Sequence, residues 1–427
     1  MRILIKDTMI AAVDEQDVIK NGYVLIEGDT IKEAASGAYH GKLDNTKVID
    51  GSSYCVMPGL VNCHTHMAMT LLRGYGEGLP LMRWLNEKIW PMEAKFGEEH
   101  IRIGTELALV EMLRTGTTTV NDMYFMQDTV KACAEKFNVR AVLGFPIMGE
   151  NWEGLLNSVL PSINKTNSEG KAMCRAMLAP HSAYTLSLDG LRAIAEAAKN
   201  NGCGIHIHLS ETEDEQKIIM DKYGMTPAKL LLEAGIFEVN TMAAHCIYLS
   251  PEDMDIVKQK NVNPVYNPQS NMKLASGTAR VMEMLHKNIN VCLGTDGASS
   301  NNNLNMFGEM ETGALLQKLY YKDTTALSGK NVLELATLNG ARALGFNNLG
   351  SIKPGNLADL IMVSLNRPSM TPVHDIYSNI AFSANGSEVE YVIINGVMVM
   401  EKGIFTSIDE EKVLYESRQL VNKLMKA

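Results

Sequence analysis

The middle of the chain alternates between short apolar runs and longer amphipathic stretches. Eight such runs recur, and they read CVMPGLVNCH, TTTVNDM, VRAVLGF, CRAMLAPH, GIHIHLSE, TMAAHCIYL, NVNPVYNPQS and NVCLGTDG. Helical patterns lie between them, as at residues 101–116 and 188–202, and the second ends in Asn201-Gly202, a typical helix C-cap. Short buried strands that alternate with helices are typical of a parallel sheet, and eight repeats predict an α/β fold of the (β/α)₈ TIM-barrel type.

The two ends of the chain have a different, strand-rich pattern. Apolar and polar positions alternate in RILIKDTMIAAV and YVLIEGDTIKEAAS, with Gly28-Asp29 as a hairpin signal, and again in LADLIMVSL and VEYVIINGVMVMEKGIF, with Asn395-Gly396 as the turn. We therefore expect both ends to meet in one small β-sandwich domain, made of residues 1–57 and 355–427, beside a barrel of residues 58–354. Helical spacing in the last 19 residues predicts a C-terminal helix.

Composition and charge narrow the class of protein. A chain of 427 residues exceeds the size at which one hydrophobic core stops growing, which agrees with two domains. Its net charge of -10 argues against binding to nucleic acid or to an anionic membrane. The sequence contains no apolar stretch long enough for a membrane span and no secretory signal pattern. Seven scattered cysteines without a Cys-x-x-Cys motif suggest reduced thiols in a cytoplasmic protein.

Polar side chains stand near the C-terminal end of nearly every apolar run. In chain order they are His64, His66, Asn121, Asp122, His181, His208, Glu211, His245, Asn267, Asn271 and Asp296. The C-terminal ends of the strands form the active-site face of a barrel, and ionisable groups are costly to bury there unless they are paired or bound. A single histidine would more often be structural, but five of them near successive strand ends predict a functional site.

The spacing of the histidines indicates a metal. His64 and His66 are two residues apart, so both side chains point to the same side of an extended segment. His206 and His208 repeat this spacing, and we prefer His208 as a ligand because it lies at the end of its run, with His206 as a packing neighbour. Three imidazoles and the Asp296 carboxylate would suit one divalent cation, Zn²⁺ first and Fe²⁺ next.

Longer blocks of sequence make the similarity more specific. PGLVNCHTHM, WLNEKIWPMEAKF, HLSET, AAHCIYL, NPQSNMKLASG and TDGASSNNNLN together resemble the metal-dependent amidohydrolase superfamily. Within it the chain is most similar to the 5′-methylthioadenosine/S-adenosylhomocysteine deaminases and their chlorohydrolase-like relatives. The resemblance covers essentially the whole chain.

The resemblance implies hydrolytic deamination of adenosine-type nucleosides by a metal-activated hydroxide. Its implied ligands for one metal ion are His64, His66, His208 and Asp296. Glu211 would be the acid/base residue and would also contact the substrate. Asp296 would have a catalytic and a substrate-binding role in addition to binding the metal, and His245 would orient the attacking water. The run CRAMLAPH lacks the lysine that bridges two ions in other members, which favours a single ion.

Three further positions are implied to bind the substrate. Glu93 would hold the ribose hydroxyls, His181 would contact the purine or the ribose, and Trp84 would form an apolar wall. Each also has an ordinary structural interpretation, since an acid or a tryptophan near a helix is often a solvated or core residue. The expected partner is a small nucleoside, with a homo-oligomer possible.

The same residues bear on three other functions. An enzyme of the same fold could act on guanine, pterin or s-triazine substrates, but a ribose-binding Glu93 would be pointless there. A non-catalytic scaffold should have lost metal ligands, whereas all are present. A nucleotide-phosphate enzyme is disfavoured because no Gly-x-x-x-x-Gly-Lys loop occurs.

One departure from the family pattern concerns the substrate's 5′ group. Members that accept S-adenosylhomocysteine place arginines after the third strand, where they can meet the amino acid carboxylate. Here Phe145 aligns with the first of them, no Lys or Arg occurs between Arg140 and Lys165, and Arg140 is interpreted as structural. We therefore expect 5′-methylthioadenosine, 5′-deoxyadenosine or adenosine to be preferred over S-adenosylhomocysteine.

Overall fold

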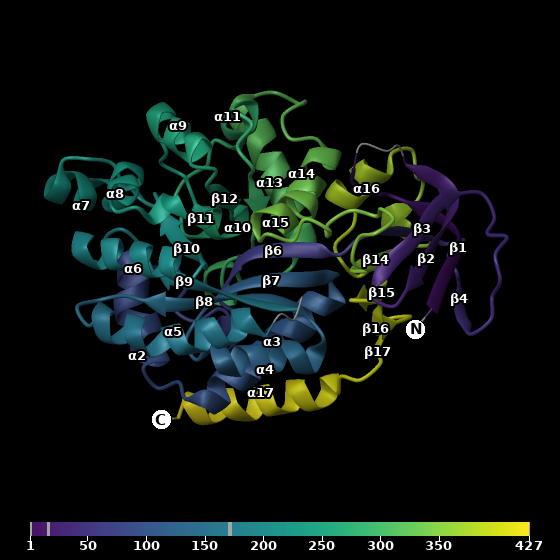
Figure 1. Cartoon of the computed structure of the whole chain (residues 1–427), viewed down its shortest axis with the longest axis horizontal. Coiled ribbons are helices and arrows are strands. Elements are labelled where there is room, and N and C mark those ends of the chain that lie inside the picture. Colours follow the sequence, from purple (N-terminus) through teal and green to yellow (C-terminus); the bar gives the residue numbers. More distant parts are fainter. Residues whose placement is uncertain (1, 15–17, 170–172, 427) are drawn as a thin grey trace.

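Eight parallel strands form the barrel that the eight apolar runs predicted (Figure 1). The computed structural model describes residues 2–14, 18–169 and 173–426. The barrel strands pair in chain order and are β6 (Leu60–Thr65), β7 (Thr117–Met123), β8 (Arg140–Ile147), β9 (Cys174–Pro180), β10 (Gly204–Leu209), β11 (Thr241–His245), β12 (Asn263–Tyr266) and β13 (Cys292–Leu293). The amide of Asp296, just after β13, donates to the carbonyl of His64 in β6 at 2.9 Å, which joins the first strand to the last.

Helices cover the outside of the barrel because the outward-facing strand residues are apolar (Figure 1). The longer ones are α3 (Glu98–Arg114), α4 (Gln127–Phe137), α5 (Trp152–Ser168), α6 (Leu188–Asn200), α7 (Glu213–Tyr223), α9 (Pro251–Gln259) and α13 (Met306–Tyr321). Shorter ones are α8 (Pro227–Glu233), α10 (Pro268–Lys273), α11 (Val281–His286), α12 (Ala298–Asn301), α14 (Gly329–Leu335) and α15 (Leu338–Ala343). The helices predicted at residues 101–116 and 188–202 are α3 and α6.

A short helical segment follows β6 and covers the C-terminal rim of the barrel. It consists of the 3₁₀ helix η1 (Met67–Leu72), α1 (Leu81–Trp84), the π-helical turn η2 (Leu85–Ile89) and α2 (Trp90–Glu93). Trp84, Leu85 and Ile89 are buried, so this segment packs onto the barrel. It brings Trp84 and Glu93 to the same rim as the strand ends.

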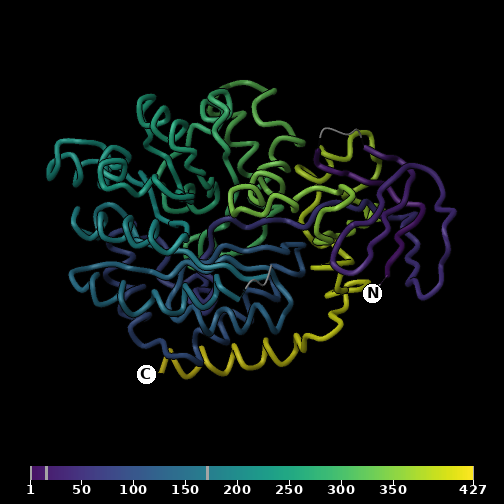
Figure 2. Tube along the Cα trace, viewed as in Figure 1, coloured from purple at the N-terminus to yellow at the C-terminus, as the bar shows by residue number. Residues whose placement is uncertain are grey.

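Both ends of the chain meet in one nine-stranded mixed sheet, as predicted (Figure 2). Its strands are β1 (Arg2–Ile10), β2 (Ile19–Glu27), β3 (Thr30–Ser36), β4 (Thr46–Asp50), β5 (Tyr54–Pro58), β14 (Leu360–Ser364), β15 (Val389–Ile394), β16 (Val397–Glu401) and β17 (Ile404–Phe405). β1 pairs with β4 and, further along, with β5, and residues from both chain ends share one apolar core. Backbone hydrogen bonds connect the two predicted turns through Ala358. The amide of Ala358 donates to the carbonyl of Asp29, and the amide of Gly396, in the β15–β16 turn, donates to the carbonyl of Ala358.

The C-terminal helix leaves the mixed sheet and lies along the barrel. This helix, α17 (Glu410–Leu424), packs on α3, where Nε of Arg114 donates to Glu410 at 2.6 Å (Figure 1). The remaining short helices are η3 (Ile236–Glu238), η4 (Pro368–Met370) and α16 (Ile376–Phe382). We propose domain borders at 57/58 and 354/355. The first of them falls at the end of β5, which ends at Pro58, whereas β6 begins at Leu60.

A buried ion pair joins the barrel to the mixed sheet. Arg140, at the start of β8, donates from Nε and Nη2 to the Asp359 carboxylate at 2.8 and 3.0 Å, and both side chains are almost fully buried. Asp359 also accepts the amide of Asn395 at 2.7 Å. This agrees with the structural role expected for Arg140.

Replacing Asp359 with asparagine should lower the free energy of unfolding by about 3–5 kcal/mol, because it removes the buried carboxylate that accepts two hydrogen bonds from the Arg140 guanidinium. Glu233→Gln is the matched control, because Glu233 pairs with Arg192 at 2.9 Å on the surface and such pairs contribute about 0–1 kcal/mol. Denaturant unfolding followed by circular dichroism measures both. Equal losses in the two variants would contradict a stabilising role for the buried pair.

Two further expectations can be compared with the structure. All seven cysteines are free and buried, in agreement with reduced thiols. Within the residues that the structure describes, no helix combines the length and the apolar character needed to cross a bilayer.

Candidate metal centre and active site

Six histidines gather at the centre of the barrel, near the C-terminal ends of its strands. They are His64, His66, His181, His206, His208 and His245, and neighbouring ring centroids lie 4.7–5.6 Å apart. They come from β6, β9, β10 and β11 and the turns that follow them, so parallel pairing of these strands places them on one rim.

The four predicted metal ligands are divided between two groups of possible ligands that share His64, and the second group also contains His245, which was not predicted as a ligand. One group is His64, His66 and Asp296, and the other is His64, His208 and His245, with possible ligand atoms within 4.8 Å of one another in each group. Nε2 of His64 is buried without a hydrogen-bond partner and lies 3.4 Å from Oδ1 of Asp296. Burial lowers the pKa of His64 to about 4, so the imidazole is neutral, as a metal ligand must be. These donors fit a divalent cation.

Hydrogen bonds orient the imidazoles toward the centre. Nδ1 of His66 donates to the carbonyl of Met123 at 2.6 Å, and Nδ1 of His208 donates to the carbonyl of His181 at 2.7 Å. In the neutral ring each bond places the proton on Nδ1 and directs Nε2 toward the cation site, which is the usual arrangement around metal-binding histidines.

His64 is oriented by another histidine. Its Nδ1 lies 2.9 Å from Nε2 of His206, so His206 can accept the Nδ1 proton and leave Nε2 of His64 free. His206 is fully buried inside the barrel below the metal-site residues. The interpretation of His206 as a neighbour agrees with this position, and its hydrogen bond with His64 adds an orienting contact that spacing alone did not indicate.

Asp296 is held by two serine hydroxyls. Ser270 and Ser300 donate to its Oδ2 at 2.6 and 2.8 Å, so Oδ1 faces the imidazoles. Burial alone would raise the pKa of Asp296, but the His64 and His66 imidazoles beside its carboxylate hold it well below its usual range. The carboxylate is therefore ionised and can serve as a ligand.

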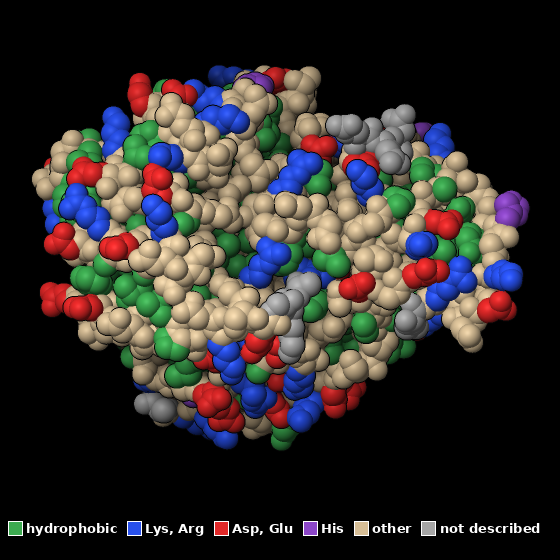
Figure 3. Space-filling view, viewed as in Figure 1, with side chains coloured by type: hydrophobic (Ala, Val, Ile, Leu, Met, Phe, Trp, Pro, Cys, Tyr) green, Lys and Arg blue, Asp and Glu red, His purple; other side chains and the backbone are tan. Residues whose placement is uncertain are grey.

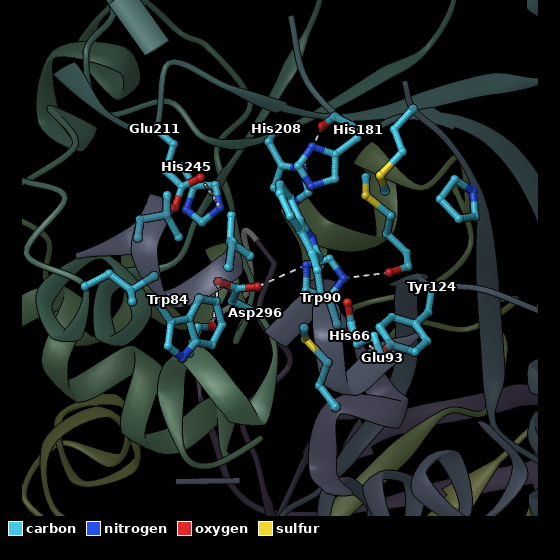
Figure 4. Close-up of a pocket in the computed structure, with 18 of the residues that line it drawn as sticks. His66, Trp84, Trp90, Glu93, Tyr124, His181, His208, Glu211, His245 and Asp296 are labelled. Carbon is cyan, nitrogen blue, oxygen red and sulfur yellow. Dashed lines mark hydrogen bonds and ion pairs between the residues drawn. The ribbon is translucent and has the colours of Figure 1, made fainter. Parts of the chain in front are cut away.

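Glu211 and His245 face each other beside this cluster (Figure 4). Oε2 of Glu211 lies 3.9 Å from Nε2 of His245. Burial raises the pKa of Glu211, which suits a carboxyl group that must hold and release protons near neutral pH. Nδ1 of His245 donates to Oδ1 of Asn271 at 2.9 Å, so Nε2 is the nitrogen that faces the site.

A pocket opens over the cluster. Eight of the predicted site residues line this pocket, and they are His66, Trp84, Glu93, His181, His208, Glu211, His245 and Asp296. The predicted ligand His64 is not part of the lining. Trp84 and Trp90 both line the pocket, and Glu93 lies near Tyr124 (Figure 4). The hydroxyl of Tyr124 donates to Glu93, whose pKa is raised by burial.

Phe145 does not occupy the place that the alignment suggested. Its side chain belongs to the apolar layer outside β8, together with Leu143 and Ile147. The side chains that reach the pocket from this region are those of Pro146 and Met148. Successive strand residues alternate between the two faces, so a shift of one residue reverses the direction of the side chain. Pro146 and Met148 therefore line the pocket in this region, and Phe145 does not.

Several contacts were not predicted from the sequence. Tyr124, Ser270, Ser300 and the hydrogen bond of Asn271 all support predicted site residues. Tyr124 lies directly after strand β7, and that position was its only signal, whereas Ser300 lies in the short helix α12 beyond β13. Asn271 was noted at a run end, but its partner His245 is 26 residues away.

Three comparisons place the chain among known proteins. Residues 55–399 match the sequence profile described as "Amidohydrolase family". The chain is 57% identical over 422 residues to a 5-methylthioadenosine/S-adenosylhomocysteine deaminase from Clostridium tetani, covering 98% of both chains. It resembles an adenosine deaminase from Xanthomonas campestris with bound zinc, at a TM-score of 0.95 and 31% identity, covering 100% of this chain and 99% of the other. It also shares the fold of a 22% identical atrazine chlorohydrolase from Arthrobacter aurescens, at a TM-score of 0.90, covering 98% and 100%.

Proposed function

The chain belongs to the amidohydrolase family, and we propose that its pocket removes the amino group of adenosine-type nucleosides. It is a hydrolase that converts the 6-amino purine to the inosine analogue and ammonia. The similarity to the Clostridium tetani deaminase extends over nearly the full length of both chains. The observation that carries the proposal is that one pocket contains a metal-ligand set, a buried acid and a second carboxylate, Glu93.

The enzyme contains a divalent metal, and we propose one Zn²⁺ per chain, with Fe²⁺ as the alternative. His64, His66, His208 and Asp296 would hold it, in line with the zinc of the Xanthomonas campestris adenosine deaminase. A bound divalent cation of this kind lowers the pKa of water toward about 7 and so provides the nucleophile at neutral pH. His245 is kept out of the ligand set in this proposal, because its Nε2 faces Glu211.

Glu211 carries the proton transfers. Its carboxyl group can give a proton to N1 of the purine as C6 becomes tetrahedral. The resulting carboxylate can then take the remaining proton of the attacking water oxygen and pass it to the amino group, which leaves as ammonia. His245 holds the attacking water in line with C6, and its tautomer is set by Asn271. Burial of both side chains excludes bulk water that would compete for these protons.

Glu93 provides the contact that favours a nucleoside over a free base. Tyr124 donates to one of its oxygens, which leaves the other to accept hydrogen bonds from the ribose hydroxyls. His181 contacts the purine or ribose from β9, and Trp84 forms the apolar wall. The alternative substrates, guanine, pterins and s-triazines, have no sugar to use this carboxylate.

The 5′ end of the substrate would meet an apolar surface. Pro146, Met148, Phe125 and Leu274 line the pocket, and among the residues that the structure describes no Lys or Arg belongs to its lining. A carboxylate on the 5′ group would therefore lose a charge-assisted pair of about 1.5–3 kcal/mol. We propose that 5′-methylthioadenosine, 5′-deoxyadenosine and adenosine are preferred over S-adenosylhomocysteine.

A nucleoside panel tests this function and this preference together. The shift from adenine-type to hypoxanthine-type ultraviolet absorption should appear with 5′-methylthioadenosine, with kcat/KM roughly tenfold or more above that for S-adenosylhomocysteine. Guanine and an s-triazine serve as negative substrates. Faster turnover of either negative substrate would reject the nucleoside assignment, and equal kcat/KM for the two nucleosides would reject the preference alone.

The surface agrees with a small-molecule enzyme. On the face shown in Figure 3, Lys and Arg side chains are interspersed with Asp and Glu. With a net charge of -10, such a surface offers little to a polyanion. We propose a cytoplasmic location, on the seven unpaired cysteines.

A further inference from the structure

A buried carboxylate lies directly behind Glu211, outside the pocket lining. Glu215, on the first turn of α7, is only 1% exposed. It has no Lys or Arg partner among the ion pairs of the described residues. Burial raises its pKa to about 7. A carboxyl group that is costly to bury must have backbone contacts that justify its place.

Both oxygens of Glu215 accept amides of the segment that carries Glu211. Oε1 accepts the amide of Ser210 at 3.1 Å, and Oε2 accepts the amide of Glu211 at 2.8 Å. In a capping box the acid at this position would instead reach back to the N-cap residue, here Thr212. Thr212 already caps α7 by accepting the amide of Glu215 at 3.1 Å. The carboxylate therefore fixes the chain before the helix rather than the helix end itself.

The fixed segment has an uncommon backbone conformation and a second attachment. Ser210 has φ of 53°, in the left-handed region that a serine rarely adopts. Its carbonyl accepts the amides of both Ile247 and Tyr248 at 3.0 Å. These residues follow His245, whose φ is 73°. The Ser210 peptide thus ties the segment of Glu211 to the segment of His245.

We propose that Glu215 is a positioning residue for the deamination, which sets the direction of the Glu211 side chain toward His245. Its carboxylate accepts the amides of Ser210 and Glu211. The carbonyl of Ser210 is held in turn by the amides of Ile247 and Tyr248, which follow His245. With this peptide fixed, Oε2 of Glu211 stays 3.9 Å from Nε2 of His245. The role rests on the proposed function of Glu211.

Glu215→Gln tests the role, because an amide side chain can accept only one of the two N–H groups and turns an NH₂ toward the other. We expect kcat to fall about ten- to a hundredfold, with KM within about threefold and metal content unchanged, as for a lost orienting contact. Asp253→Asn is the matched control. Asp253 is a buried acid at the same position of α9, where it accepts the amide of Ser250 at 3.0 Å and the hydroxyl of Thr226 at 2.6 Å. Asp253→Asn should leave kcat unchanged at a similar loss of thermal stability.

A double-mutant cycle separates the possible failures. If Glu215 acts through Glu211, adding Glu215→Gln to Glu211→Gln should change kcat less than twofold. Full additivity, or wild-type kcat in Glu215→Gln, would overturn the positioning role while leaving Glu211 as the acid/base residue. If Glu211→Gln itself stays active, the proposed function fails instead. Should Glu215→Gln not fold, Glu215→Asp, which keeps the charge but is shorter, takes its place in the same cycle with the same outcomes.

Discussion

Replacing Glu211 with glutamine is expected to lower kcat by about 10²–10⁴, the range for a lost general acid/base group. Glutamine keeps the size and polarity of the side chain but cannot give or take the proton. The expected fall therefore separates the chemical role of the carboxyl group from its packing. KM for 5′-methylthioadenosine should change by only a few-fold, because Glu93, Trp84 and His181 still line the pocket.

The environment of Glu211 suits the two proton transfers that we propose for its carboxyl group. Its side chain is 13% exposed, and this burial raises its pKa. A carboxyl group with a raised pKa loses its proton less completely at neutral pH, so it can protonate N1 and recover the proton afterwards. Nε2 of His245 lies 3.9 Å from Oε2 of Glu211, which is close enough for an electrostatic interaction but too far for a direct hydrogen bond.

Glu213→Gln is the matched control for this experiment. Glu213 lies two residues further on, at the exposed start of α7, and should tolerate the same substitution with wild-type kcat. Stopped assays with 5′-methylthioadenosine give kcat and KM, and elemental analysis gives the metal content. A Glu211→Gln enzyme that turns over within a few-fold of wild type would refute the acid/base role.

The barrel could be predicted because its signal is local. Each buried parallel strand is a continuous apolar run, and its C-terminal end carries the polar residue that faces the rim. His181, His245 and Asp296 were located in this way, one run at a time. The two hairpin turns at Gly28 and Gly396 were equally local, since both require a positive φ, which is 64° and 71° in the structure.

Contacts between distant segments gave no such signal. His64 and His206 are 142 residues apart, and Tyr124 and Glu93 are 31 apart, so neither hydrogen bond could be predicted from spacing. The prediction for the Phe145 side chain was wrong for a different reason. A match between two sequences that is shifted by one residue places a side chain on the opposite face of a strand, because the two faces alternate with every residue.

The hydrogen-bond partners of Glu211 and His245, the proposed catalytic pair, follow a common pattern. His245 is oriented by Asn271, and the backbone of Glu211 by Glu215, so each reactive side chain has a buried polar group behind it. Such groups are conspicuous only after folding, since Asn271 and Glu215 have no pattern that distinguishes them from a helix cap. The chemistry-bearing residues are therefore easier to find in a sequence than the residues that orient them.

Removing His64 should remove the metal and the activity together. His64 is the one residue that belongs to both possible ligand groups, with His66 and Asp296 on one side and His208 and His245 on the other. His64→Ala leaves no complete set of donors, so we expect the metal content to fall from one ion per chain to near zero and the deaminase activity to disappear with it. His286→Ala is the control, because His286 is exposed on the end of α11 and should keep both.

The variants of His208 and His245 decide which of the two groups holds the ion. In the proposed site His208 is a ligand, so His208→Ala should also lose the metal. His245 is oriented by Asn271 toward Glu211, so His245→Ala should keep one ion per chain while kcat falls. Elemental analysis after dialysis against a chelator, with native mass spectrometry, measures the ratio directly. Two ions per wild-type chain, or a metal-free His245→Ala protein, would require a different ligand set, and an active His64→Ala enzyme would exclude the metal centre as the source of catalysis.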